Sequence, residues 1–379
     1  PRGPHPQRSP QRPREHHPSG WGEPTMSPPR PGPVAAVLAA ATLTLAGCTA
    51  TGSGASAGGA PLPANAPALE QTYVSVVARV LPSVVQITTD HDLGSGVVFD
   101  TKGDIVTNAH VVGSATMFQV RLAGSAAGQP ASLVGSYPPD DLAVIHLDSP
   151  PSGLRPAHFG DSAKLTIGDI VLAMGNPLGL TGSVTNGIVS GPGRTVTEPR
   201  GGGSPGATLP DAIQTSAAIN TGNSGGALVD LAGDVIGIPT LAAIDTQIGG
   251  TGGSAAPGIG FAISSNLVTD VAGQLVATGH VTNSHRAELG VQVTTVLDPN
   301  GAPTGVGAEA VVAGGPAAAA GLQAGEIITA VNNTPVHSTS ELAAALAHLD
   351  PGQTIPVTIT DQQGQTRTLM VTLGQLPGS

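Results

Sequence analysis

Residues 221–228 read Thr-Gly-Asn-Ser-Gly-Gly-Ala-Leu, and this stretch, taken with two upstream segments, decides the fold. A serine hydroxyl attacks a carbonyl carbon when a base removes its proton, a carboxylate orients that base and hydrogen-bond donors face the oxyanion. Gly222 permits a backbone conformation in which an N–H group points inward. Ser224 is therefore the candidate nucleophile, and the predicted oxyanion hole comprises Gly222 and Ser224, with Asn223 in the same turn.

Two upstream segments supply the other groups that this chemistry needs. Residues 107–112 (TNAHVV) place His110 at the end of a predicted strand, and residues 140–145 (DDLAVI) place two aspartates before the next. Each motif alone has an ordinary structural explanation, but the order histidine, aspartate, serine is that of chymotrypsin-type barrels. The spacing does not choose between Asp140 and Asp141 as the carboxylate.

The segment from about 69 to 279 has the pattern of an all-β structure. Short β-branched and apolar runs alternate there with Gly, Pro, Asp and Asn, which favours a barrel or sandwich, and the length fits a double barrel. The expected strands include 84–88, 96–99, 142–145 and 170–173. A helix is expected over 264–279, because Leu267, Val271 and Leu275 recur at helical spacing.

Two glycine-rich runs flank the later strands of this segment. Residues 191–210 form a Gly/Pro-rich insert and residues 249–258 a second such run, and both are expected to lack regular structure. Gly225 and Gly226 are interpreted as leaving room for a substrate beside Ser224.

The C-terminal part has a different pattern, with short strands around a helix. Strands are expected at 291–293, 310–312, 327–331 and 355–359. Ser338 and Glu341 form a capping-box pattern at the start of a helix whose apolar face carries three leucines, and Pro351-Gly352 ends it.

The N-terminal 25 residues are rich in Pro, Arg and His and are expected to be a disordered or untranslated leader. Residues 26–48, which begin with Met, have a charged start, a short apolar run and a small-residue cleavage site, as in signal peptides. The run is too short for a membrane-spanning helix. Residues 49–68 then read as a flexible linker.

Composition excludes several classes of function. The formal net charge is −11 and no basic cluster follows the leader, which argues against nucleic-acid binding. No zinc-site spacing and no phosphate-binding loop is present, so neither a metal nor a cofactor is expected. The single cysteine, Cys48, rules out an intramolecular disulfide.

Together these motifs resemble the Deg/HtrA serine endopeptidases. The resemblance runs from about residue 74 to the end and is carried by five stretches: GSGV at 94–97, TNAH at 107–110, DLAV at 141–144, GNP at 175–177 and GNSGG at 222–226. It implies a chymotrypsin-like double six-stranded β-barrel over residues 69–282. In that family the aspartate directly before Leu-Ala-Val is catalytic, which selects Asp141.

The C-terminal stretch 315–328, followed by Val331-Asn332, resembles the PDZ domains of the same family, which implies an α+β PDZ domain over residues 287–376. The corresponding peptide-binding loop is Glu288, Leu289, Gly290 and Val291, whose amides would cap a ligand's C-terminal carboxylate. The residues Leu-Ala-Gly-Cys at 45–48 resemble the bacterial lipobox, which implies a lipid on Cys48.

The S1 pocket is expected from its position relative to the nucleophile. Its walls would come from Ala218 and Ile219 and from the substrate-pairing strand Ile238, Pro239, Thr240 and Leu241. No Asp or Lys lies there, so small or medium aliphatic side chains such as Val or Ala are expected at P1.

Two residues depart from the family pattern. Ser216 stands where an aspartate is usual, and Pro239 stands where an asparagine is usual in the strand after the nucleophile. Proline has no N–H for a ladder, so one hydrogen bond to the substrate backbone is expected to be lost or shifted.

The resemblance implies proteolysis of misfolded or exported polypeptides outside the cytoplasm by a lipoprotein on the outer face of the cell membrane. A homotrimer is a further expectation, with Tyr73 as the aromatic candidate for its contact. The alternatives are a chaperone-like or scaffolding protein that cleaves little, and an enzyme dedicated to processing one partner.

Overall fold

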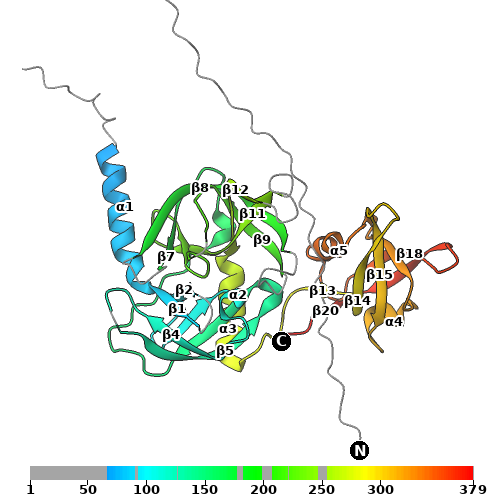
Figure 1. The fold of residues 1–379 in the computed structure, drawn as a ribbon, viewed down its shortest axis with the longest axis horizontal. Coiled ribbons are helices and arrows are strands. Elements are labelled where there is room, and N and C mark those ends of the chain that lie inside the picture. Colours follow the sequence, from blue (N-terminus) through cyan, green and yellow to red (C-terminus); the bar gives the residue numbers. More distant parts are fainter. Residues whose placement is uncertain are drawn as a thin grey trace, which may run out of the picture. The chain divides into compact units, whose positions relative to one another are not determined.

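The computed structural model describes residues 66–89, 93–125, 127–176, 182–198, 207–220, 222–245 and 254–378. Strands dominate this part of the chain. They form two closed six-stranded barrels followed by a smaller sheet with its own helices (Figure 1). The predicted fold class, a double barrel followed by an α+β PDZ domain, is confirmed.

The first barrel carries the histidine and the aspartates. Its strands are β1 (Val84–Thr88), β2 (Leu93–Val98), β3 (Asp104–Thr107), β4 (Met117–Arg121), β5 (Gln129–Tyr137) and β6 (Leu142–Leu147), closed in the order β1-β2-β3-β6-β5-β4. Its interior is almost wholly aliphatic, with Ile87, Ile105 and Ile145 fully buried. Closure pairs every strand on both sides, so the barrel has no open edge.

The second barrel carries the serine. Its strands are β7 (Ile170–Gly175), β8 (Ser183–Glu198), β9 (Ala207–Thr215), β10 (Ala227–Val229), β11 (Val235–Asp245) and β12 (Ser254–Ser264), closed in the order β10-β11-β12-β9-β8-β7. Leu172, Ile213 and Leu228 are among its buried side chains.

The expectation that residues 191–210 lack regular structure is wrong for most of that run. β8 continues to Glu198 and pairs with β9 from Val189↔Thr215 to Glu198↔Ala207. The register shifts three times along this hairpin. Such bulges accommodate the Gly and Pro residues that suggested a loop. Residues 254–258 of the second run likewise belong to β12.

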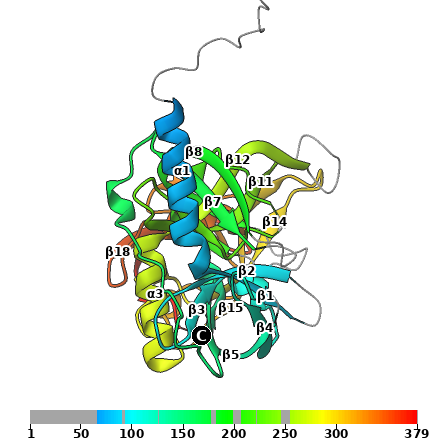
Figure 2. The same cartoon turned by 90° about the vertical axis from the view of Figure 1, so that its left-hand side faces the viewer.

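Two longer helices pack against the barrels. α3 (Ser265–Thr278), which matches the expected helix to within one residue at each end, packs against β5, β6, β11 and β12, so it spans both barrels (Figure 2). Its Val268, Val271 and Leu275 are buried, and Gly279 ends it in the left-handed conformation.

α1 (Ala66–Val80) was not anticipated by the sequence analysis, which assigned residues 66–68 to the linker. Val76 and Val80 are buried against the protein core, and Arg79 donates to the carbonyl of Ala232 in the β10–β11 turn at 2.5 Å. The helix is therefore held by tertiary contacts with the barrels, not by its intrinsic propensity.

The remaining short helices are η1 (Leu81–Ser83), α2 (Ala109–Val112), η2 (Pro138–Asp140) and η3 (Ser162–Lys164). The C-terminal sheet contains β14 (Val291–Leu297), β15 (Pro303–Val311), β16 (Ile327–Val331), β17 (Thr334–Pro335), β18 (Thr354–Thr360) and β19 (Thr366–Thr372). β13 (Ala287–Glu288) pairs with β20 (Gly374–Gln375), and the helices are α4 (Pro316–Ala319) and α5 (Thr339–Leu346).

The capping box at α5 forms only in part. Ser338 Oγ accepts from the Glu341 amide at 3.2 Å as predicted, but the Glu341 carboxylate accepts from the amide of His337, one residue earlier than a capping box requires. α5 also ends at Leu346, before the Pro351-Gly352 pair that was expected to stop it.

Residues 1–65, with the predicted leader, signal peptide, Cys48 and most of the linker, lie outside the described residues. Within the described ranges, no helix has both the length and the apolar character that a membrane span requires.

Candidate active site

The imidazole of His110 and the carboxylate of Asp141 lie together in the first barrel. His110 is in α2, directly after β3, and its Nδ1 is 2.8 Å from Asp141 Oδ2. The His110 backbone amide donates to the other carboxylate oxygen at 2.9 Å. Asp141 is 1% exposed and its backbone is left-handed (φ 51°), a conformation that Asp tolerates better than most residues. The carboxylate is therefore held by the same residue that it orients.

The neighbouring Asp140 serves a different purpose. Its carboxylate pairs with the Arg286 guanidinium at 2.7 Å and its side chain is fully buried. Burial raises the pKa of Asp140 to about 6, although the Arg286 charge acts in the opposite direction. The geometry thus separates the two aspartates that the spacing alone left open, since Asp141 is the one that reaches His110.

Thr240 of β11 connects the first barrel with the nucleophile. Its hydroxyl donates to Asp141 Oδ2 at 2.5 Å, and its carbonyl accepts from Ser224 Oγ at 3.3 Å. Asp141 and Ser224 therefore both bond to one residue of the second barrel, and His110 is joined to it through Asp141. The side chain of His110 is 25% exposed and Ser224 is half-buried, so both are open to a substrate.

Thr240 was predicted only as part of the S1 strand, and its contact with Asp141 was not predicted. Asn108 was likewise quoted only as part of a motif, yet its side-chain amide donates to the Asp141 carbonyl at 3.0 Å. The signal for Asn108 was its position two residues before His110, and Thr240, which lies 99 residues from Asp141 in sequence, gave no signal.

The loop that carries Ser224 is a tight turn, and its amides differ in whether they are already hydrogen-bonded within the protein. Gly222 has φ 116°, in the region that favours glycine. The Asn223 amide donates to the Asn220 carbonyl at 3.1 Å, so it faces into the loop and not toward an oxyanion. This corrects the inclusion of Asn223 among the oxyanion donors. For the amides of Gly222 and Ser224, no acceptor is found among the described residues.

The two glycines after the nucleophile have a different reason from the one expected. A Cβ on Gly225 would overlap the Ser95 carbonyl oxygen and Thr107 Oγ1, and a Cβ on Gly226 would overlap the Met174 carbonyl oxygen. The space beside these glycines is thus filled by the protein itself. They are required for packing of the loop between the barrels, not for substrate access.

The residues expected to line S1 differ in their exposure. Ile238 is fully buried in the core cluster, so its side chain does not line an open pocket. Ala218 is exposed and available as a wall, whereas Ile219 is only 8% exposed and packs in an apolar cluster of the second barrel. Leu241 pairs with Phe261 through the backbone, and its side chain lies outside the described residues.

Pro239 affects the nucleophile loop and not the β11–β12 ladder. Its carbonyl accepts from the Gly225 amide at 3.0 Å. In a strand, the N–H and C=O of one residue point toward the same edge, so the N–H that proline lacks would also have faced this loop. Ser216, the second departure, bonds to both backbone groups of Ile188 in β8: its hydroxyl accepts from the Ile188 amide and its amide donates to the Ile188 carbonyl.

The predicted peptide-binding loop of the C-terminal domain lies between β13 and β14. Gly290 has φ 69°, and its carbonyl accepts from the Val312 amide, while the Leu289 carbonyl accepts from Ala317. Burial raises the pKa of Glu288. Val291 begins β14, the edge strand of the described sheet, which is the arrangement that peptide addition to a sheet requires.

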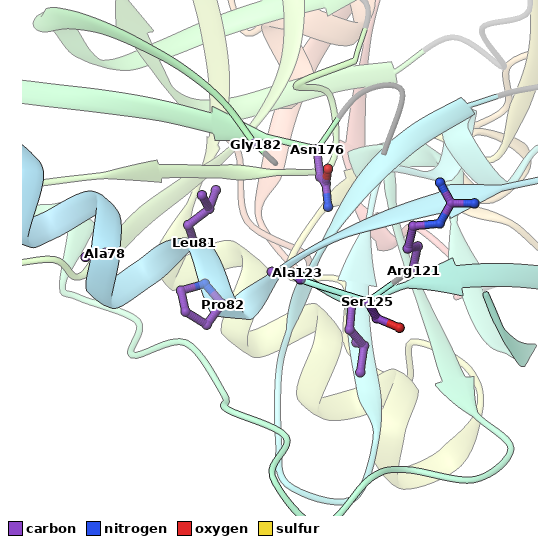
Figure 3. A pocket seen from close by; sticks show the side chains of 10 residues that line it. Ala78, Leu81, Pro82, Arg121, Ala123, Ser125, Asn176 and Gly182 are labelled. Atoms are coloured by element: carbon purple, nitrogen blue, oxygen red, sulfur yellow. The ribbon is translucent and has the colours of Figure 1, made fainter. Parts of the chain in front are cut away.

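A cavity of about 410 Å³ is lined in part by Asn176. Its walls include Leu81, Pro82 and Leu122, and Figure 3 shows the Asn176 side chain pointing into it. The lining is mainly apolar. Among the described side chains, no group of three or more His, Cys, Asp or Glu could hold a metal ion.

Comparisons with known proteins agree with this arrangement. Family models match residues 94–238 as a trypsin-like peptidase domain and residues 307–360 as a PDZ domain. Serine protease PepD of Mycobacterium tuberculosis is 39% identical over 79% of this chain, which spans 65% of PepD, just under two thirds. Serine endoprotease DegS of Salmonella typhimurium is 35% identical, over 81% of this chain and 87% of DegS.

A solved structure of the HtrA-type protease AlgW with a decapeptide is also similar, with a TM-score of 0.54 and 32% sequence identity. The match covers 80% of this chain and 99% of the other. The likeness therefore includes both barrels and the C-terminal domain.

The Gly225→Ala variant tests the packing of the nucleophile loop. A Cβ at this left-handed position costs about 1–2 kcal/mol, and its overlap with Ser95 and Thr107 adds about 1–3 kcal/mol. Gly193→Ala is the matched control, because Gly193 has φ 68° and open space around its Cβ position. Urea unfolding should show the larger loss for Gly225→Ala, and equal losses in the two variants would contradict the packing argument.

Proposed function

The chain belongs to the Deg/HtrA family of serine endopeptidases, and on that premise we propose that it hydrolyses peptide bonds of misfolded or exported polypeptides through Ser224, His110 and Asp141. The observation that carries this proposal is the chain of hydrogen bonds that runs from His110 through Asp141 and Thr240 to Ser224. Hydrolysis proceeds through an acyl-enzyme that forms on Ser224 Oγ and is then released by water.

Each group has a defined task in the proposed reaction. Asp141 Oδ2 accepts from His110 Nδ1, so Nε2 is the nitrogen left to take the proton from Ser224 Oγ. His110 then gives this proton to the leaving amine. The carboxylate stays ionised and stabilises the imidazolium that forms.

The amides of Gly222 and Ser224 are the proposed oxyanion donors. They flank the Asn223 amide, which is already bonded within the loop. Preorganised donors of this kind stabilise the tetrahedral intermediate more than the planar substrate, because they are placed where the negative charge develops.

We further propose that the C-terminal domain binds peptide C-termini, of substrates or of activating ligands, through Glu288, Leu289, Gly290 and Val291. The left-handed Gly290 and the free edge of β14 support this proposal. A carboxylate would approach the loop amides while the peptide extends along β14. A homotrimer, with Tyr73 near its contact, is proposed on family grounds only.

For the location, we propose an extracytoplasmic lipoprotein with its acyl chains on Cys48. The support is the position of the only cysteine directly after Leu-Ala-Gly, at the end of an apolar run. Two signals are needed for stable anchoring, so more than one acyl chain is expected.

Covalent labelling with a fluorophosphonate tests the nucleophile. The wild-type protein should be labelled on Ser224, and Ser224→Ala should lose the label and about 10⁶-fold in turnover of a peptide substrate. Ser75→Ala removes an exposed serine of α1 and should keep both. A wild-type protein that is never labelled, even with an activating peptide, would instead favour the chaperone-like alternative.

Cleavage of a peptide library tests the S1 proposal. Ala218 and Ile219 present no charge to a P1 side chain, so cleavage after Val or Ala should exceed cleavage after Arg or Asp by at least about tenfold, as apolar pockets discriminate. Preferred cleavage after a charged residue would contradict the assignment of Ala218 and Ile219 to the S1 pocket. It would not affect the assignment of Ser224 as the nucleophile.

Intact-mass measurement of the mature protein from a membrane fraction tests the anchor. The expected N-terminal residue is Cys48 carrying acyl groups, and Cys48→Ser should release the protein from the membrane. A mature N-terminus at any other residue would refute lipidation.

A further inference from the structure

Ser95 of β2 is a fully buried serine at the junction of the two barrels. Its hydroxyl donates to the Gly222 carbonyl at 2.6 Å and accepts from the Asn176 amide at 2.8 Å. Its own amide donates to the Ser224 carbonyl at 3.0 Å. One residue of the first barrel thus holds two carbonyls of the nucleophile loop.

The first of these bonds sets the orientation of a peptide plane. In a trans peptide the C=O and the N–H point in opposite directions. The Gly222 carbonyl points to Ser95, and the Asn223 amide of the same peptide points to Asn220. This plane is therefore held at both ends, and it lies between the two amides that the proposed function assigns to the oxyanion.

The second bond holds the peptide on the other side of the nucleophile. The Ser224 carbonyl accepts from Ser95, and the Gly225 amide of the same peptide donates to Pro239. Ser224 is accordingly placed between two peptide planes that are both tied to Ser95. Rotation of either plane would turn an adjacent amide away from the cleft.

Glycine makes this restraint necessary. Gly222 has no Cβ and few steric limits on its dihedrals, so its backbone is set by hydrogen bonds and not by sterics. Some of these bonds lie within the loop, such as that from the Asn223 amide to the Asn220 carbonyl. The hydroxyl of Ser95 supplies what the glycine lacks, and Thr107 Oγ1 in turn fixes Ser95 by donating to its carbonyl at 2.7 Å.

We propose that Ser95 is a positioning residue for the oxyanion hole: its hydroxyl holds the Gly222–Asn223 peptide so that the amides of Gly222 and Ser224 face the cleft. The inference rests on the proposed function and adds to it a residue from the other barrel. Ser95 does not touch the reacting atoms, and it acts through the loop.

The test compares Ser95→Ala with Ser265→Ala. Ser265 is equally buried and donates a bond of the same length, 2.6 Å, to the Gly160 carbonyl, but none of its hydrogen bonds reaches the nucleophile loop. Both variants leave a carbonyl unpaired and should lose stability, and Ser95→Ala should lose more because it also leaves the Asn176 amide unpaired. Their kinetics should differ.

For a peptide substrate with Val at P1, Ser95→Ala should lower kcat by about 10-fold to 100-fold. This is less than the loss that follows deletion of an oxyanion donor, because the variant keeps both amides and only loosens their positions. Its KM should stay within about twofold, because donors aimed at the oxyanion act in the transition state. Ser265→Ala should keep kcat. Ser95→Cys, which retains a weak donor, should give an intermediate kcat and serves if the alanine variant does not fold.

Hydrogen exchange gives a readout that does not depend on activity. Amides of residues 222–226 should exchange faster in Ser95→Ala than in the wild type, with no such change in Ser265→Ala. Equal kcat in the two alanine variants, or unchanged exchange in residues 222–226, would overturn the role of Ser95. A wild-type protein without peptidase activity would refute the proposed function, and the exchange comparison would then decide the role of Ser95 by itself.

Discussion

The carboxylate of Asp141 is the group on which the arrangement of the site depends. It receives the imidazole and an amide from the first barrel and the Thr240 hydroxyl from the second. A buried carboxylate is costly unless its oxygens are hydrogen-bonded, and here each oxygen is. This requirement draws β11 toward α2, and it brings the Thr240 carbonyl to Ser224.

Closure of the barrels explains why such side-chain bonds are needed. Each barrel pairs its strands among themselves, and among the described strands no ladder joins one barrel to the other. The halves are aligned by α3, by apolar contacts and by a few hydrogen bonds that cross between them. Ser95 and Thr240 contribute the crossing bonds nearest the nucleophile, which places them where small displacements would matter most for chemistry.

The nucleophile loop shows how packing and conformation act together. A glycine is required at position 225 for two reasons. Its φ is positive, and the Ser95 carbonyl oxygen occupies the space that a Cβ would fill. Pro239 is also compatible with this loop. Its carbonyl accepts from the Gly225 amide, and that bond does not require the N–H that proline lacks. Residues that look permissive in sequence are thus closely constrained by the opposite barrel.

The sequence by itself determined the fold class, the strands that carry the motifs and the residues of the proposed triad, because periodicity, turn residues and motif order are local properties. It did not identify α1, whose buried valines belong to an apolar cluster made by both barrels, or the long β8–β9 hairpin, whose bulges contain the Gly and Pro residues that suggested a loop. It also misplaced Asn223 and Ile238 and missed what Ser95 and Thr240 do. Asn223 and Ile238 depend on how their own loop and strand fold, which the motif did not reveal. Ser95 and Thr240 bond to residues of the opposite barrel about 100 positions away, and such contacts leave no local pattern, so only the tertiary structure decided them.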